Sequence, residues 1–146
     1  MRNVKLISAC GIFILVFLSI FLSFTTGAAS NEIYGTWRLV SFAIKDTATG
    51  KTTDAFGKNP KGFINYGRDG RMMVLIVQGE RPKPVDLSEM TDAERAQLFK
   101  TCISYGGTYT FNGTTVTHHV DISWNENWTG TEQVRNVAFE GKRLIL

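Results

Sequence analysis

The polar side chains best suited to chemistry lie near the end of the chain, in two segments that alternate between apolar and polar residues. His118 shares a face with apolar residues of the segment 114–124, and Gln133 and Arg135 share a face that ends in two apolar residues. Arginine binds a carboxylate through two parallel N–H donors, and an imidazole or a phenol such as Tyr109 adds a further hydrogen bond. We therefore expect these four side chains to orient a ligand that bears a carboxylate or carbonyl, within a mostly apolar pocket.

The same pattern has a purely structural interpretation, in which Arg135 pairs with a carboxylate at the rim and His118 is a hydrogen-bonded core imidazole. Successive strand residues point to opposite faces, so His118 and His119 cannot hold one metal ion together. No HExxH spacing is present, and no nucleophile is spaced with its base. The sequence therefore predicts no metal, no cofactor and no catalytic residues, and it favours binding over an enzyme.

Short segments rich in β-branched and aromatic residues are separated by turn signals. Asp69-Gly70 and Asn112-Gly113 are typical of tight hairpin turns, and Glu140-Gly141-Lys142 separates the last two apolar segments. The strands predicted from this pattern are 37–44, 52–56, 62–66, 71–78, 105–111, 114–124, 132–139 and 143–146. Consecutive hairpins favour an antiparallel meander, and closing it into a barrel removes exposed edges.

One helix is predicted to interrupt the strands. The segment 79–84 carries two prolines, which break a sheet, and Thr91 with Glu94 then fits a capping box. Phe99 and Cys102 fall on one face of this helix. We expect that face to cover the sheet, with Cys102 as a buried packing residue.

The N-terminus has the composition of an export leader. Two basic residues precede an uncharged stretch over residues 6–24, and small residues follow it. Residues 1–29 are predicted to be a signal peptide cleaved after Ala29, or an uncleaved membrane anchor, since about 20 apolar residues span a bilayer as a helix. Residues 30–146 would then form a periplasmic or secreted domain, or one anchored to the membrane through residues 6–24.

The positive charge of the chain comes largely from this leader. Without Arg2 and Lys5 the 16 basic groups fall to 14, against 13 acidic groups, which leaves a formal net charge of +1. No basic run with interleaved aromatics is present, which argues against nucleic-acid binding. About 117 residues follow the leader, enough for one domain, and Cys102 has no partner for a disulfide there.

Five ordered sequence blocks resemble those of the lipocalin-like domain family of small, mostly bacterial calycin-type proteins. The blocks are Gly35–Ser41, Gly62–Met72, Tyr105–Tyr109, Thr117–Val120 and Asn127–Arg135. The resemblance implies an up-and-down β-barrel of about eight strands with a cavity for a small ligand, and it implies no defined catalytic set. It also implies that Gly35 and Trp37 are structural, with Trp37 packed across one closed end. Family members usually continue through a final strand or two, so the resemblance leaves the strand that closes this barrel unassigned.

The sequence thus predicts an exported small-molecule-binding protein that holds a lipophilic ligand in a barrel cavity, with membrane contact only through an uncleaved leader. Trp128, in a polar loop, would grip a ligand at the rim or plug the open end. One alternative is a cavity-based isomerase, cyclase or hydratase with His118 as general acid or base. Another is a membrane-tethered structural or interaction barrel without ligand, filled by bulky residues such as Phe63, Met72 and Met73. The sequence does not indicate the oligomeric state.

Overall fold

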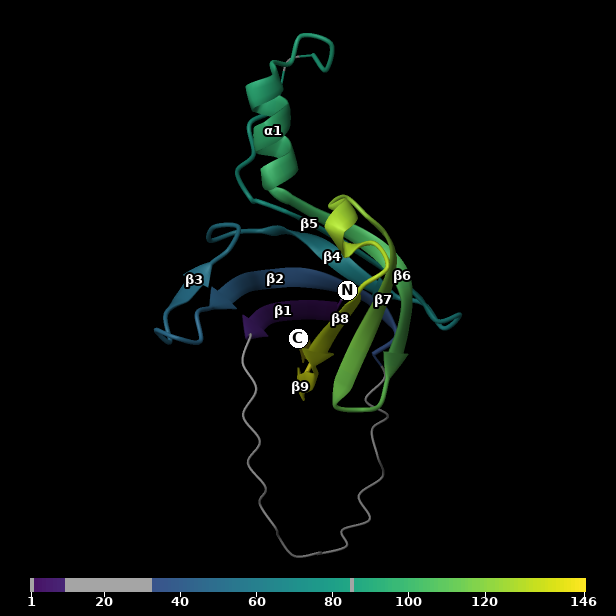
Figure 1. Cartoon of the computed structure of the whole chain (residues 1–146). Coiled ribbons are helices and arrows are strands. Elements are labelled where there is room, and N and C mark those ends of the chain that lie inside the picture. The colour runs from purple at the N-terminus through teal and green to yellow at the C-terminus, as the bar shows by residue number, and fades with distance from the viewer. Residues whose placement is uncertain (1, 10–32, 85) are drawn as a thin grey trace, which may run out of the picture.

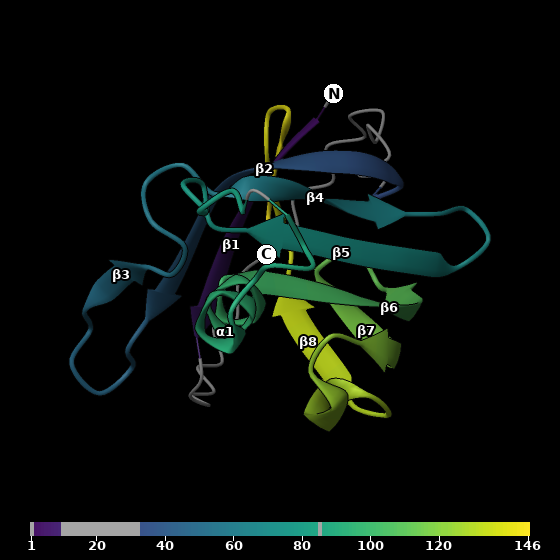
Figure 2. The same cartoon turned by 90° about the horizontal axis from the view of Figure 1, so that it is seen from above.

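The fold is a mainly β, nearly closed barrel with one α-helix, seen in a computed structural model that describes residues 2–9, 33–84 and 86–146 (Figures 1 and 2). The strands are β1 (Arg2–Ala9), β2 (Gly35–Lys45), β3 (Thr52–Asp54), β4 (Lys61–Tyr66), β5 (Arg71–Val77), β6 (Cys102–Phe111), β7 (Thr115–Ser123), β8 (Glu132–Asn136), β9 (Ala138–Glu140) and β10 (Arg143–Ile145). The helix α1 (Asp92–Lys100) lies between β5 and β6, and a short 3-10 turn, η1 (Glu126–Trp128), lies between β7 and β8.

The strands form one sheet in the order β8-β7-β6-β5-β4-β2-β1-β10-β9, and β3 pairs with β2 outside this path. The two strands at the ends of this order, β8 and β9, follow one another in the chain with only Val137 between them. The chain itself therefore joins the two sheet edges, and the sheet curls into a barrel (Figure 2). The expected mainly β barrel with one inserted helix is confirmed, and the strand pairs are antiparallel except for the two that β1 forms.

Both predicted hairpin turns are present. Tyr66 pairs with Met72 across the first turn, and Phe111 pairs with Val116 across the second. Gly70 has φ +80° and Gly113 has φ +98°, values that residues with a Cβ rarely adopt. These glycines let the chain reverse, and the reversal fixes which residues of the neighbouring strands face inward.

The first described strand differs from the sequence-based expectation. Arg2–Ala9 forms β1, which runs parallel to both of its neighbours, β2 and β10. A hydrophobic helix was expected to begin at residue 6, and over residues 6–9 the structure has strand instead. Residues 10–24 of the expected leader, and the expected cleavage position after Ala29, lie outside the described residues. Within the described ranges no helix has the length and apolar character needed to cross a bilayer.

β1 occupies the position that closes the barrel. Val4 is only 1 % exposed and belongs to the core, and the N–H of Leu146 donates to the Lys5 carbonyl at 2.9 Å. The guanidinium of Arg2 lies over the Trp37 ring, 5.0 Å from its centroid. Without these contacts β2 and β10 would each present an unpaired edge. Residues near the N-terminus thus supply the strand that the family resemblance left unassigned.

α1 projects from one end of the barrel (Figure 1), and none of its residues is buried. Its predicted capping box is present: Glu94 N–H donates to the Thr91 hydroxyl, and Thr91 N–H donates to the Glu94 carboxylate. The predicted packing face is wrong, because the helix ends at Lys100 and Cys102 already belongs to β6. Phe99, left alone on that face, is 55 % exposed.

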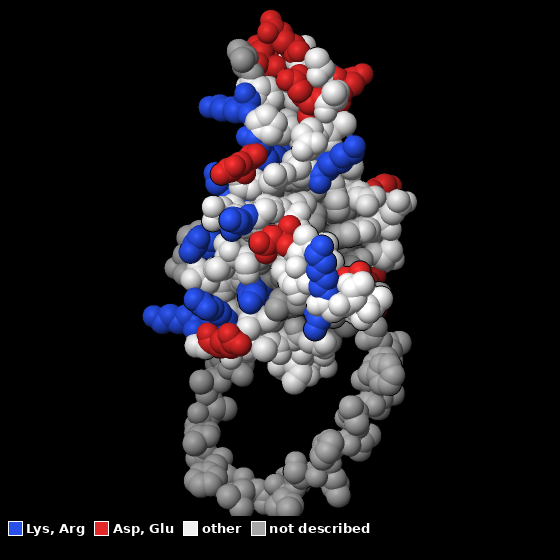
Figure 3. Space-filling view, turned by 90° about the vertical axis from the view of Figure 1, so that its left-hand side faces the viewer, with Lys and Arg blue, Asp and Glu red and all other residues white. Residues whose placement is uncertain are grey.

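The projecting segment is acidic at its far end, whereas basic and acidic side chains are interspersed over the part of the barrel below it (Figure 3). The exposed acidic residues of this segment are Asp86, Glu89, Asp92 and Glu94. The face in view carries no continuous Lys/Arg patch. The end of the projecting segment thus differs from the barrel wall in carrying mainly negative charge.

Candidate functional site

A cavity of about 410 Å³ lies within the barrel. Most of its wall is apolar, with contributions from Phe42, Phe56, Ile64, Val74, Ile76 and Leu146. Ile64 of β4 and Val74 and Ile76 of β5 face inward because strand side chains alternate between the two faces of the sheet. Three polar side chains interrupt this apolar wall, namely Tyr105, Gln133 and Arg135. The composition is that of a small-molecule site: apolar, with a few convergent polar groups.

Arg135 and Gln133 reach the cavity from β8. Gln133 pairs with His118, and Arg135 pairs with Val116, in the β7–β8 register. The Arg135 guanidinium donates to the Val134 carbonyl at 2.8 Å and to Gln133 Oε1 at 3.3 Å. Among the described residues no carboxylate lies within ion-pair distance of Arg135. The partly buried guanidinium therefore faces the cavity wall without an acidic counter-charge from that part of the chain.

His118 lies deeper, between two phenol hydroxyls. Its side chain is 1 % exposed, with Nε2 at 2.7 Å from Tyr66 Oη and Nδ1 at 2.9 Å from Tyr105 Oη. The three residues come from β7, β4 and β6, so only the assembled barrel brings them together. His118 is thus a hydrogen-bonded core imidazole, and Tyr105 is the group that connects it to the cavity wall.

Burial and the charge of the Arg135 guanidinium both shift the pKa values of this cluster. Burial lowers the pKa of His118 to about 3, and the positive charge of Arg135 contributes in the same direction. Burial raises the pKa of Tyr105 to about 12 and raises that of Tyr66, while Arg135 opposes both shifts. The imidazole is therefore neutral and both phenols are protonated near neutral pH, so Arg135 carries the charge of the site.

Trp128 also lines the cavity, from the η1 turn. Its ring makes edge contacts with Tyr105 at 5.5 Å and with Trp124 at 4.9 Å between ring centroids. Phe42 and Phe56 form another edge contact at 5.5 Å on the same cavity. Aromatic side chains therefore make up a large part of the cavity wall.

Tyr109 does not line this cavity. Its hydroxyl donates to the Gly67 carbonyl at 2.8 Å, and its ring makes an edge contact with Tyr66 at 4.8 Å between centroids. The expectation that Tyr109 joins Arg135 at a ligand is therefore not reflected in their placement. Tyr66 and Tyr105, which sequence reasoning did not place in the site, are the phenols beside His118. The only sequence signal for Tyr105 was that it shares one face of a predicted strand with Tyr109, and Tyr66 had no such signal.

The opposite end of the barrel holds the two residues expected to be structural. Trp37 is 2 % exposed; its indole N–H donates to the Ile33 carbonyl at 2.7 Å, and its ring lies 6.1 Å from that of Phe139. Gly35 has φ +111°, which favours glycine over any residue with a Cβ. Neither residue lines the cavity that holds Tyr105, Gln133 and Arg135.

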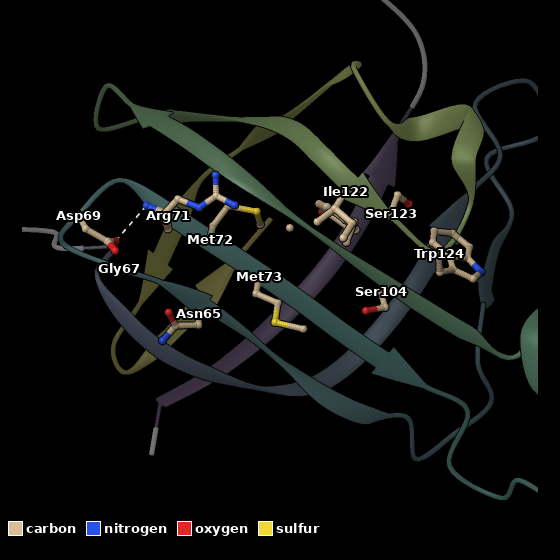
Figure 4. A pocket seen from close by; sticks show the side chains of 12 residues that line it. Asn65, Gly67, Asp69, Arg71, Met72, Met73, Ser104, Ile122, Ser123 and Trp124 are labelled. Atoms are coloured by element: carbon tan, nitrogen blue, oxygen red, sulfur yellow. Dashed lines mark hydrogen bonds between the residues drawn. The ribbon is translucent and has the colours of Figure 1, made fainter.

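A larger hollow, of about 620 Å³, lies on the outer face of the sheet (Figure 4). Met73 from β5 and Ile122 from β7 line it, and they are 48 % and 67 % exposed. A molecule held there would stay in contact with water, and the arginine that lines it, Arg71, already forms an ion pair with Asp121. The inner cavity is therefore the better candidate site.

The two adjacent histidines point to opposite faces, as strand alternation predicts. His119 is on the outer face, where its Nδ1 lies 3.0 Å from Glu132 Oε1. Within the described part of the chain no three His, Cys, Asp or Glu side chains gather in a way that suits a metal ion.

Residues 34–146 of the chain match a family model described as a lipocalin-like domain. No curated protein and no solved structure gives a significant match to the chain.

Proposed function

Because the chain belongs to the lipocalin-like domain family, whose barrels generally bind small hydrophobic ligands, we propose that it binds a lipophilic carboxylate in the barrel cavity. The acyl chain lies against the apolar wall, and the carboxylate faces Arg135, with Gln133 and Trp128 beside it. The ligand is held without chemical change.

The observation that carries this proposal is the guanidinium of Arg135. A charge that is partly removed from water is costly unless it has a partner, and the described residues supply no carboxylate for it. A ligand carboxylate supplies that partner through charge-assisted hydrogen bonds. The cavity volume of about 410 Å³ falls within the roughly 300–1,000 Å³ typical of small-molecule sites.

The protonation of the buried groups favours binding over catalysis. General acid–base catalysis works best when the pKa of the catalytic group lies near the working pH. The pKa of His118 is lowered to about 3 and that of Tyr105 is raised to about 12, so both move away from neutrality. Tyr105 is therefore suited to form a hydrogen bond with a ligand, and His118 to support Tyr105, without transfer of a proton.

A ligand-free barrel filled by its own side chains is also less well supported. Of the residues expected to fill it, Met72 faces inward, but Met73 is 48 % exposed, and Phe63 alternates with the buried Ile64. The inner cavity therefore keeps its volume, because Met73 and Phe63, two of these three residues, belong to the outer face.

We further propose that the barrel works outside the cytoplasm, after export directed by the leader. The uncharged stretch over residues 6–24 supports this proposal. Residues 2–9 cannot serve at the same time as part of a membrane-inserted leader and as the strand β1. Export thus requires that these residues leave the barrel or enter it only after translocation.

The proposal is tested with decanoate, titrated calorimetrically into the purified protein and into the variant Arg135→Met. Loss of a hydrogen bond to a charged group costs about 1.5–3 kcal/mol, so affinity should fall by roughly ten- to a hundredfold. Arg143→Met is the matched control, since Arg143 is exposed on β10, and it should bind as the unmodified protein does. Equal affinity of the Arg135→Met variant, or no binding of decanoate at all, would refute the proposal.

A further inference from the structure

The imidazole of His118 has a hydroxyl at each ring nitrogen. Tyr66 Oη lies 2.7 Å from Nε2 and Tyr105 Oη lies 2.9 Å from Nδ1. All three side chains are buried, with exposed fractions of 1 %, 7 % and 1 % for Tyr66, Tyr105 and His118. Each polar hydrogen in this cluster must therefore find its acceptor in the protein or in the cavity.

The cluster holds one hydrogen-bond donor more than it can use internally. A neutral imidazole has one N–H donor and one bare nitrogen acceptor, and each phenol has one O–H donor. Two hydrogen bonds join the three groups, so one phenol donates to the bare nitrogen and the other accepts from the N–H. The phenol that accepts keeps its own hydroxyl hydrogen, which must be directed away from the imidazole.

The surroundings of the two phenols differ, and the difference decides which one has the surplus donor. Tyr66 does not line the cavity, and within the described residues its hydroxyl has no hydrogen-bond partner besides His118. Tyr105 lines the cavity, where a ligand oxygen or water can accept its hydrogen. The arrangement that leaves no orphan donor is Tyr66 O–H to Nε2, then Nδ1–H to Tyr105 Oη, then Tyr105 O–H into the cavity.

We propose that Tyr105 is the specificity-determining hydroxyl of the site, donating to an oxygen of the ligand carboxylate that also faces Arg135. This inference rests on the proposed function and deepens it, because it names the hydroxyl that recognises the carboxylate of the ligand. All three hydrogen bonds point toward the cavity, so each one polarises the next. Arg135 and Tyr105 thus both present donors to the head, which suits a carboxylate; an alcohol would bring a further donor, and an amine a further positive charge.

The tautomer of His118 gives the first test. In protein labelled with ¹⁵N-histidine, two-bond proton–nitrogen spectra tell the protonated ring nitrogen from the bare one, and His119→Gln assigns the signals. The inference expects His118 to carry its hydrogen on Nδ1, both alone and with decanoate. A hydrogen on Nε2 would overturn it, because Tyr105 would then be the phenol that donates to the imidazole.

The second test compares the decanoate affinity of two matched tyrosine variants. Tyr105→Phe removes the proposed donor and should weaken binding about tenfold, as expected for one hydrogen bond to a charged group. Tyr109→Phe is the control, because the Tyr109 hydroxyl donates to the Gly67 carbonyl and does not touch His118. Unchanged affinity of the Tyr105→Phe variant would overturn the inference.

Different results refute the proposed function and the assignment of Tyr105. Absence of decanoate binding by the unmodified protein, or equal binding by Arg135→Met, refutes the proposed function. Binding that depends on Arg135 but not on Tyr105, or that occurs with the Nε2–H tautomer, refutes only the assignment of Tyr105. The tautomer measurement uses the unmodified site, so it decides the order of hydrogen bonds even if Tyr105→Phe folds poorly.

Discussion

At the scale of single residues, the barrel interior combines a neutral polar cluster with one charge. His118 is kept neutral by burial and by Arg135, and its two ring nitrogens are both hydrogen-bonded. A neutral imidazole can link two hydroxyls, since it accepts a hydrogen bond at one nitrogen and donates one from the other. The charge of the site therefore comes from Arg135, and the direction of the hydrogen bonds comes from His118.

The lowered pKa of His118 predicts a pH dependence of stability. Its pKa in the folded protein is about 3, below the ordinary value of 6.5 that applies to the unfolded chain. Between these values the unfolded state binds more protons, so the free energy of unfolding decreases as pH falls from 6.5 toward 3. One histidine contributes a slope of at most about 1.4 kcal/mol per pH unit. Urea denaturation of the unmodified protein at several pH values measures this slope.

The matched variants for this prediction are His118→Gln and His119→Gln. Glutamine donates and accepts hydrogen bonds without titrating, so the first variant should lose the part of the slope due to His118. The second removes the neighbouring histidine on the outer face and should leave that part in place. Identical slopes in the unmodified protein and in His118→Gln would show that His118 does not resist protonation in the folded state.

Strand alternation made part of the site predictable from sequence. It placed His118, Gln133 and Arg135 on inward faces, because each belongs to a segment whose alternate residues are apolar. It could not pair His118 with Tyr66, which lies 52 residues away and reaches it only through the assembled sheet. Nor could it show that Tyr105 and not Tyr109 lines the cavity, since the two lie on one face of a predicted strand and only tertiary contacts distinguish them.

At the scale of elements, β1 is the strand that closes the barrel. It pairs with β2 and β10 and brings Val4 into the core. Its sequence did not predict a strand, because basic residues before an uncharged stretch are typical of a leader. Parallel pairing between distant segments also leaves no local signal of the kind that Asp69-Gly70 or the Thr91 capping box provides.

A charge at Val4 tests the placement of β1. Val4→Asp would bury an unpaired carboxylate in the core, which typically destabilises a protein by about 3 kcal/mol or more. Lys5→Asn, at the exposed neighbouring position, should have little effect on the midpoint of thermal unfolding. If both variants unfold at the same temperature as the unmodified protein, β1 is not part of the barrel in solution.

Because α1 projects from the barrel, we expect loss of its N-terminal cap to destabilise the helix alone. Thr91→Ala removes the capping hydroxyl and should speed amide hydrogen exchange within α1. None of the helix residues is buried, so the barrel should keep its thermal midpoint. Slower exchange in β5 and β6 than in α1 is expected in both proteins. A large drop in the barrel midpoint would mean that α1 supports the barrel more than its exposed position indicates.

At the scale of the whole molecule, the closure of the barrel and the proposed export involve the same residues at the N-terminus. A chain cleaved after Ala29 lacks β1 and exposes the edges of β2 and β10, which favours self-association. We expect the mass of protein recovered from the periplasm or medium to show cleavage, and the cleaved form to associate more than the full chain in sedimentation experiments. An intact mass for exported protein would leave β1 available to close the barrel and would contradict cleavage.

The most direct test of the central claim is the ionisation of the bound ligand itself. Decanoate labelled with ¹³C at the carboxyl carbon is titrated by NMR while bound to the unmodified protein and to Arg135→Met. A carboxylate beside a guanidinium has a lowered pKa, so the bound ligand should stay ionised to lower pH than free decanoate, and the variant should remove this shift. A bound carboxylate that titrates as it does in water, or identically in both proteins, would contradict binding at Arg135.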